Sequence, residues 1–323
     1  MNNPWEELKI PAKDVSAKRV DAEHPLDFFW AKDHIGRYLF LYEYPHDSDA
    51  SIKNPPDLAG IETISRPGPN RSTILVFVLK EKANWEIFLT LCKDLLRATQ
   101  PISNPKSAPV AILQHLRRWH EFLKKNRLDI LTEEKIKGLI GELIFLKNFL
   151  SPKYGIVDSV KSWVGPEGSP QDFNINDSAI EVKCQLGTTT PYVKISSAEQ
   201  LQTQMKNLYL FVITLGKATD ISSNSVNLPD LIDGISNVLA SESPNTLDRF
   251  QDYLSSVGYF YSDKYKDYQY LLLDNFVFHI KEDFPRIVPT DLKPGIIKLT
   301  YHIGLSDCKP YEIDISNWEM IKT

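Results

Sequence analysis

One short stretch constrains the fold of this chain more than any other: residues 171–185 read QDFNINDSAIEVKCQ. The pattern predicts two short strands joined at Asn176 and Asp177, a dipeptide that tolerates the positive φ of a two-residue hairpin turn. Residues that face each other across such a hairpin have numbers that sum to 353. Asp172 is therefore predicted to lie directly opposite Glu181.

Side-chain alternation gives the predicted hairpin two chemically different faces. The apolar face carries Phe173, Ile175, Ile180 and Val182. The polar face carries Asp172, Asn174, Glu181 and Lys183. Two carboxylates that are directly opposed destabilise a strand pair unless a positive charge lies between them. A divalent cation would remove that conflict, and the ammonium group of Lys183 is predicted on the same face.

A further carboxylate is predicted on the apolar face of a helix. The pattern predicts this helix over 132–150, with Thr132 as its N-cap. At about 100° per residue, four apolar side chains lie within about 60° of Glu142; they are Leu139, Phe145, Leu146 and Phe149. A charge at such a position needs a partner, and Lys135 on the same helix is one candidate. Gly138 and Gly141 lower helix propensity, which indicates close approach of another backbone.

Composition is that of a globular protein. The 323 residues are 42% hydrophobic and include six Trp, fourteen Tyr and fifteen Phe, which argues against a disordered chain. The net charge of −5 argues against a protein that coats nucleic acid. Residues 106–150 nevertheless hold nine Lys/Arg against five Asp/Glu, whereas residues 217–323 hold ten against sixteen. This distribution allows nucleic acid to be held at one face only.

The sequence also bears on location and on zinc. No apolar run approaches the roughly 18 residues of a membrane helix, and the first residues lack a basic and an apolar signal region. We therefore expect a soluble, cytoplasmic protein without membrane contact. Three widely spaced cysteines suit a reducing compartment, and the spacing of the cysteines and of the seven histidines argues against a zinc site.

Three regions are predicted along the chain. Residues 1–105 form a strand-rich N-terminal unit, with strands near 26–33, 36–44 and 72–80 and a helix near 84–99. Residues 106–216 form the core, which begins with a helix over 110–126. Residues 217–323 form a mixed α/β region, with helices near 228–240 and 245–257 and strands near 274–280 and 295–304.

The order of elements inside the core is informative. The helix over 132–150 is followed by a predicted strand over 154–165, the hairpin, a short helix capped by Ser196 or Ser197, and a buried strand over 208–215. The predicted fold class is therefore α/β (α+β), with an αβββαβ core and a mixed sheet.

These residues and this order resemble the PD-(D/E)XK nuclease superfamily, with its restriction-endonuclease-like fold. More narrowly, six short segments look like the bacterial PD-(D/E)XK motif proteins, which are often encoded beside restriction-modification and phage-defence genes; they are FFWAKD, LCKDLL, RRWHEFL, GLIGELIFL, SPQDFNI and IEVKCQ. The likeness covers most of the chain and is vaguest in the C-terminal third. One departure is that Gln171 separates Pro170 from Asp172, so the literal Pro-Asp pair is absent.

The resemblance implies a role for each residue of the group. Asp172 and Glu181 would bind Mg²⁺, with Mn²⁺ as a substitute, and Glu142 would hold a second ion or a water beside the first. Lys183 would orient or deprotonate the attacking water. Gln185 extends the same face and is predicted either to hydrogen-bond a phosphate or a ligand water, or to be a polar residue at the sheet edge.

Three functions are consistent with this pattern. The resemblance implies a Mg²⁺-dependent endonuclease that hydrolyses DNA phosphodiester bonds within a restriction or phage-defence system, with DNA and other defence subunits as partners. Because a double-strand cut needs two active sites, a homodimer is also expected. The alternatives are a catalytically silent nuclease-like scaffold, and an unrelated interaction module in which Asp172, Lys183 and Glu181 form a surface salt bridge.

Overall fold

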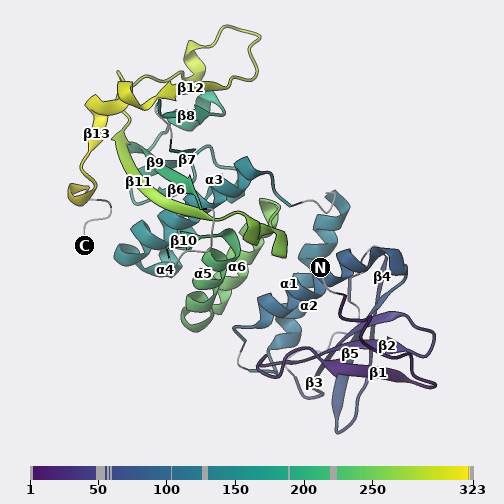
Figure 1. Cartoon of the computed structure of the whole chain (residues 1–323). Coiled ribbons are helices and arrows are strands. Elements are labelled where there is room, and N and C mark those ends of the chain that lie inside the picture. Colours follow the sequence, from purple (N-terminus) through teal and green to yellow (C-terminus); the bar gives the residue numbers. More distant parts are fainter. Residues whose placement is uncertain are drawn as a thin grey trace. The chain divides into compact units, whose positions relative to one another are not determined.

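The structure is a computed structural model that describes residues 3–48, 55–56, 58, 60–102, 104–125, 130–187, 190–218, 224–318 and 320. The chain divides into two compact units. The first contains residues 1–130 and 258–262, and the second contains residues 131–257 and 263–323 (Figure 1). Within the described residues, no helix has the length and the apolar composition that crossing a bilayer requires.

The first unit contains an antiparallel five-stranded sheet with the strand order β1-β2-β3-β5-β4. Its strands are β1 (Val15–Arg19), β2 (Asp27–Asp33), β3 (Tyr38–Pro45), β4 (Ile61–Pro67) and β5 (Ser72–Leu79). The predicted strands at β2, β3 and β5 are confirmed. The helices α1 (Trp85–Thr99) and α2 (Ala108–Lys125) follow, also as predicted.

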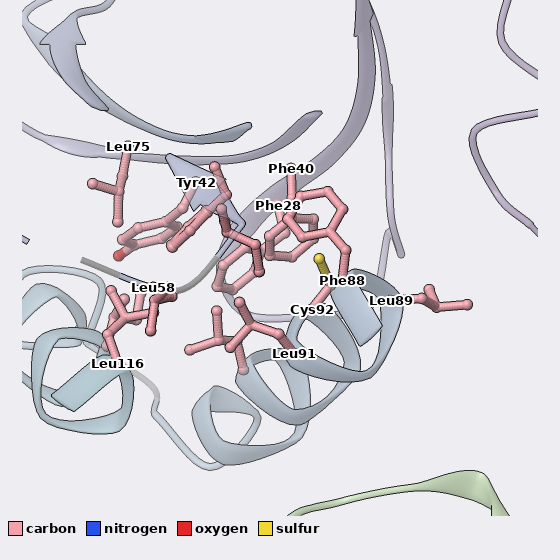
Figure 2. Packing of buried hydrophobic residues seen from close by; sticks show 14 of the residues in the cluster. Phe28, Phe40, Tyr42, Leu58, Leu75, Phe88, Leu89, Leu91, Cys92 and Leu116 are labelled. Carbon is pink, nitrogen blue, oxygen red and sulfur yellow. The ribbon is translucent and has the colours of Figure 1, made fainter. Parts of the chain in front are cut away.

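The core of the first unit lies between one face of this sheet and α1 and α2. Figure 2 shows Phe28, Phe40 and Tyr42 from the sheet gathered against Phe88 and Leu91 from α1. Each of these five side chains is at most 1% exposed. The spacing of the apolar residues in α1 explains this arrangement, because residues three and four apart share one side of a helix.

The second unit begins with a nearly continuous helical segment. Thr132 caps α3 (Glu133–Ile144), which continues into a π-helical turn (Phe145–Leu150) and then into α4 (Ser151–Ser162). The predicted helix over 132–150 is thus confirmed, but the predicted strand over 154–165 is wrong. Ile156, Ser159 and Val160 are buried at helical spacing in α4, and Gly155 forms a kink with φ of 76°. The apolar spacing there is that of a helix.

A mixed sheet forms the centre of the second unit. Its strand order is β10-β11-β9-β7-β6, and β13 also pairs with β11. The strands are β6 (Phe173–Ile175), β7 (Ser178–Leu186), β9 (Asn207–Lys217), β10 (Ser225–Val226), β11 (Tyr270–His279) and β13 (Glu312–Ile313). β7 and β9 are parallel, whereas the other pairs are antiparallel. The predicted mixed α/β fold class is confirmed.

Helices and a small sheet cover this mixed sheet. α3 packs against β7, and α5 (Leu228–Glu242) packs against α3 and α6 (Pro244–Ser256), as Figure 1 shows. β8 (Tyr192–Ile195) and β12 (Tyr301–Gly304) form the small antiparallel sheet. The predicted helix after Ser197 is reduced to the 3₁₀ helix η4 (Ala198–Leu201), and the predicted strand over 295–304 is reduced to β12.

Short 3₁₀ helices complete the described chain. They are η1 (Lys82–Asn84), η3 (Gly165–Glu167), η5 (Asp263–Asp267), η6 (Pro289–Asp291), η7 (Leu305–Tyr311) and η8 (Ile315–Asn317).

Candidate active site

The hairpin has the register that the sequence predicts. Phe173 pairs with Ile180 and Ile175 pairs with Ser178, so partner numbers sum to 353. Asn176 has a φ of 53° at the turn. Asp172 precedes the first residue of β6 and is tied to the opposite strand, because its Oδ2 accepts a hydrogen bond of 2.8 Å from the backbone N–H of Val182.

Both faces of β7 are covered, which the sequence did not indicate for the polar face. On the α3 side, a Cβ atom added to Gly141 would collide with the Sγ of Cys184. The close neighbour at Gly141 is therefore a side chain of β7 and not the predicted backbone, and a Cβ added to Gly138 would meet nothing within 4 Å. On the opposite face Ala179 packs into a cluster that includes Val193 and Leu201, so Glu181 on that face is only 1% exposed.

Lys183 lies between two acceptors. Its Nζ is 2.6 Å from Oε1 of Glu181 and donates a hydrogen bond of 3.3 Å to Oε1 of Gln200. The same Gln200 oxygen accepts a hydrogen bond of 2.7 Å from the backbone N–H of Ser196. The ammonium group is thus held by a carboxylate of its own strand and by an amide from η4.

Gln171 fixes the segment that carries Gln200. Its Nε2 donates to the carbonyl oxygens of Glu199, Gln200 and Gln202 at 2.9, 3.2 and 2.9 Å. The side chain is 5% exposed. The residue that interrupts the Pro-Asp pair is therefore a structural link between the start of the hairpin and η4.

Glu142 reaches the same group from α3. The indole Nε1 of Trp163, at the end of α4, donates a hydrogen bond of 2.7 Å to Oε2 of Glu142. Glu142 and Lys135, both described by the structure, do not form the ion pair that the helix pattern allowed. The predicted need for a partner is therefore met by an uncharged donor.

The carboxyl groups affect one another electrostatically. Burial raises the pKa of Glu181 to about 8, and the nearby Asp172 adds to the increase. Burial raises the pKa of Asp172 to about 6, against the opposing charge of Lys183. The pKa of Glu142 is raised well above its usual value by burial and then by Asp172. Burial would lower the pKa of Lys183, but the surrounding carboxylates raise it.

Gln185 contacts the neighbouring strand β9. Its Nε2 donates a hydrogen bond of 3.1 Å to Oγ1 of Thr214 on β9, and the residue is 8% exposed. Its Oε1 has no hydrogen-bond partner in the described part of the chain. Contact of Gln185 with a phosphate or a ligand water stays a prediction.

The chemistry of these donors fits a hard divalent cation. Both oxygens of Glu181 are buried; Oε1 faces the ammonium group of Lys183, and Oε2 has no hydrogen-bond partner among the described residues. Asp172 and Glu142 supply further carboxylate oxygens, the ligand type that Mg²⁺ and Mn²⁺ prefer. No three Asp, Glu, His or Cys side chains of the described chain already stand in the geometry of a metal cluster. The residues thus form a suitable donor set without a preassembled cage.

Sequence reasoning missed three residues of this group: Trp163, Gln171 as a structural link, and Gln200. Trp163 was assigned to a strand, and Gln200 to a helix without a functional signal. Trp163 hydrogen-bonds to Glu142, Gln200 hydrogen-bonds to Lys183, and Gln171 hydrogen-bonds to the backbone of η4. Each of these partners lies at least 17 positions away in the chain. Alternation and helical spacing report on near neighbours only, so neither pattern could have indicated these contacts.

Comparison with known families gives one match. Residues 1–306 match the family DUF4420, which is described as "Putative PD-(D/E)XK family member". The match covers both units, including all five residues predicted for the site. No curated protein and no solved structure matches the chain.

Proposed function

We propose, because the chain belongs to the PD-(D/E)XK family, that it is a metal-dependent nuclease that hydrolyses phosphodiester bonds of DNA. The single observation that carries this proposal is the buried carboxylate of Glu181, whose Oε1 lies 2.6 Å from Nζ of Lys183 and whose Oε2 has no hydrogen-bond partner among the described residues. A carboxylate kept in this state suits a site that binds a cation.

Each residue has a role in the proposal. Asp172 and Glu181 would hold Mg²⁺, and Glu142 would hold a second ion or a water beside the first. The bound metal would activate water and offset the negative charge that develops on the phosphate. Lys183 would orient the attacking water, because its ammonium group is held by Glu181 and Gln200 while the side chain stays partly exposed.

Cleavage assays test this proposal directly. Purified protein is incubated with plasmid and with linear DNA in Mg²⁺, Mn²⁺ or EDTA, beside the variants Asp172→Ala and Lys183→Ala. Asp177→Ala is the matched control, because Asp177 lies on the hairpin turn with a side chain that is 58% exposed. We expect wild-type protein to cut DNA only when metal is present. Cleavage activity should fall at least about 100-fold in both site variants and should be unchanged in the control. Equal cutting by the control and both site variants would contradict the assignment.

One observation favours a second candidate function. Within the described residues the acids do not converge into a metal cluster, and Oε1 of Glu181 lies 2.6 Å from the ammonium group of Lys183. This arrangement suits a catalytically silent nuclease-like subunit that binds DNA or a partner. Binding of DNA without cutting in any metal, together with a melting temperature that Mn²⁺ does not change, would favour the scaffold.

The biological setting is also a proposal. We infer a cytoplasmic component of a restriction or phage-defence system, on the basis of the family resemblance and of three cysteines that form no disulfide. Other defence subunits and a second copy of this chain are the proposed protein partners. A homodimer would place two active sites on one duplex, and light scattering during size-exclusion chromatography measures it.

A further inference from the structure

An isoleucine on the second unit is left almost completely in solvent. Ile297 is 98% exposed, the highest value among the large hydrophobic side chains that the structure describes, and the adjacent Ile296 is 48% exposed. Both lie between β11 and β12, in a yellow-green segment that Figure 1 shows as an extended loop. A single exposed apolar side chain needs no explanation, but two together at a loop tip mark a candidate contact surface.

The backbone of this tip is well defined. The N–H of Ile296 donates a hydrogen bond of 3.1 Å to the carbonyl oxygen of Lys293, which closes a four-residue turn. The two central residues are Pro294 and Gly295, and Gly295 has a φ of 94°. Proline followed by a glycine with positive φ is the combination that a type II turn requires. The turn therefore presents the two isoleucines in a definite conformation.

The base of the loop is also anchored. The backbone N–H of Ile287 donates a hydrogen bond of 3.1 Å to the hydroxyl oxygen of Tyr301, the first residue of β12. At η6, Oδ2 of Asp291 accepts a hydrogen bond of 2.9 Å from the backbone N–H of Val288. The first contact ties together the two ends of the segment that carries the tip, and the second orders one of these ends.

The anchored base lies beside the candidate active site. Nη1 of Arg286 donates a hydrogen bond of 2.6 Å to the carbonyl oxygen of Leu201, which follows Gln200 in η4. Burial raises the pKa of Tyr301, and the charge of Lys183 is among the effects that oppose this increase. The loop thus begins next to the segment that holds Lys183. DNA bound at the site would lie within reach of it.

Cations flank the apolar tip. Lys293 precedes it and Lys298 follows it, and both residues are exposed. Neither lysine is paired with an acidic side chain in the described part of the chain. The nearest acid in sequence, Asp291, is engaged with the backbone of Val288. A surface with an apolar centre and two unpaired cations complements a polyanion that also offers apolar surface.

We propose that residues 293–298 form a wedge that inserts Ile296 and Ile297 into duplex DNA at the active site, while Lys293 and Lys298 contact phosphates. This inference rests on the proposed nuclease function and adds how the duplex would be distorted. Apolar side chains that enter the minor groove partly unstack a base step, and the contacts that the bent duplex allows offset that cost. The lysines would supply affinity that falls with salt.

The decisive experiment compares the variant Ile296→Ser/Ile297→Ser with the unchanged loop. Both are made in an Asp172→Asn background and measured in EDTA, so that DNA is bound but not cut. Binding to a duplex that contains 2-aminopurine is followed by anisotropy and by the fluorescence of that base. We expect the unchanged loop to increase 2-aminopurine fluorescence, and the variant to lose this increase and to bind duplex about tenfold more weakly.

Two further variants separate the contributions. Val238→Ser removes an exposed aliphatic side chain from α5, which packs against α3 on the other side of the mixed sheet, and it should change neither signal. Lys293→Gln and Lys298→Gln should each reduce the slope of log affinity against log salt by about 1. Melting temperatures should match in all these variants, because the substituted side chains are exposed.

The outcomes distinguish this inference from the proposed function. If wild-type protein cuts DNA and the Ile296→Ser/Ile297→Ser variant binds and unstacks duplex like the unchanged loop, the wedge is refuted alone. If wild-type protein neither binds nor cuts DNA, the wedge and the nuclease both fail. If the isoleucines are instead needed for sedimentation with anionic phospholipid vesicles and not for DNA binding, the tip is a membrane contact and the wedge is overturned.

Discussion

At the residue scale, the candidate site is a group of buried carboxyl groups that raise one another's pKa. Glu181 is 1% exposed, its Oε2 has no hydrogen-bond partner among the described residues, and Asp172 lies close enough to raise its pKa further. Among the residues that the structure describes, only one cation, Lys183, is held directly against these carboxylates. Such a group is unfavourable while the acids are ionised, and it becomes favourable when positive charge is added.

Stability should therefore depend on pH in a defined direction. The pKa values of Asp172 and Glu181 are about 6 and about 8 in the folded protein, above their ordinary values of 3.8 and 4.5. A group whose pKa is higher in the folded protein than in the unfolded chain stabilises the folded state fully at pH values below its unfolded pKa. This stabilisation is lost as the pH rises through its folded pKa. In EDTA, we expect the melting temperature of wild type to fall relative to that of Asp172→Asn between about pH 4 and pH 8.

The same measurement with Mg²⁺ completes the prediction. Added Mg²⁺ should raise the melting temperature of wild type more at pH 8 than at pH 5, because the ionised carboxylates bind the ion. Parallel curves for wild type and Asp172→Asn across this range would show that Asp172 does not titrate as described.

A second residue-scale prediction concerns Gln200, which we regard as a positioning residue for Lys183. Gln200→Met keeps the size of the side chain and removes the oxygen that accepts from Lys183 and from Ser196. We expect kcat for DNA cleavage to fall about 10- to 100-fold with little change in KM, because the ammonium group loses its orientation. The matched control is Gln202→Met, since the contact of Gln202 with Gln171 uses its backbone carbonyl. Equal losses in both variants would indicate a general effect on η4.

At the element scale, α3 and β7 place Glu142 beside the hairpin through one close contact. Gly141 faces Cys184 of β7 with no room for a Cβ atom, whereas Gly138 of the same helix faces open space. The two glycines therefore have different reasons to be present, although their positions in the sequence pattern are similar. The close packing at Gly141 is what allows the Glu142 backbone to lie near the sheet.

A pair of alanine substitutions tests this difference. Gly141→Ala should destabilise the protein by about 1–3 kcal/mol, because overpacking forces Cys184 or the backbone to move. Gly138→Ala should stabilise it by up to about 1 kcal/mol through helix propensity. Urea unfolding followed by circular dichroism measures both. A loss of stability in Gly138→Ala equal to that in Gly141→Ala would contradict the packing of α3 on β7.

At the scale of the whole molecule, the chain returns to its first unit late in the sequence. Residues 258–262 belong to that unit and are bound there by Asp94 of α1. The backbone N–H of Tyr261 donates to Oδ1 of Asp94 at 2.9 Å, and Nε1 of Trp119 donates to Oδ2 at 2.6 Å. Nε2 of His115 contacts the same carboxylate. A buried acid thus joins two helices to a segment more than 160 residues away.

Removing this acid should weaken the first unit. Asp94→Ala leaves the donors of Tyr261, Trp119 and His115 without their acceptor, so we expect a loss of about 3–5 kcal/mol. Tryptophan fluorescence during urea unfolding is a suitable measurement, since four of the six tryptophans lie in this unit. Asp21→Ala, an exposed acid that accepts from Glu23, is the control and should change stability by less than about 0.5 kcal/mol. Similar losses in both variants would argue against Asp94 as a structural centre.

Local pattern determined much of this protein. Alternation with period two predicted the register and the two faces of the hairpin, and helical spacing with the Thr132 cap predicted α3. The acids and the lysine of the candidate site were found for the same reason, since they belong to that hairpin and that helix. These features depend on residues that are close in sequence, and backbone geometry alone relates such residues.

Only the tertiary structure decided the remaining features. It brought Trp163 to Glu142 and Gln200 to Lys183, and it joined the base of the loop with the exposed apolar tip to η4. Each of these depends on contacts between residues that are distant along the chain. Burial and hydrogen bonding choose such contacts after the chain has folded, and no local period in the sequence records them.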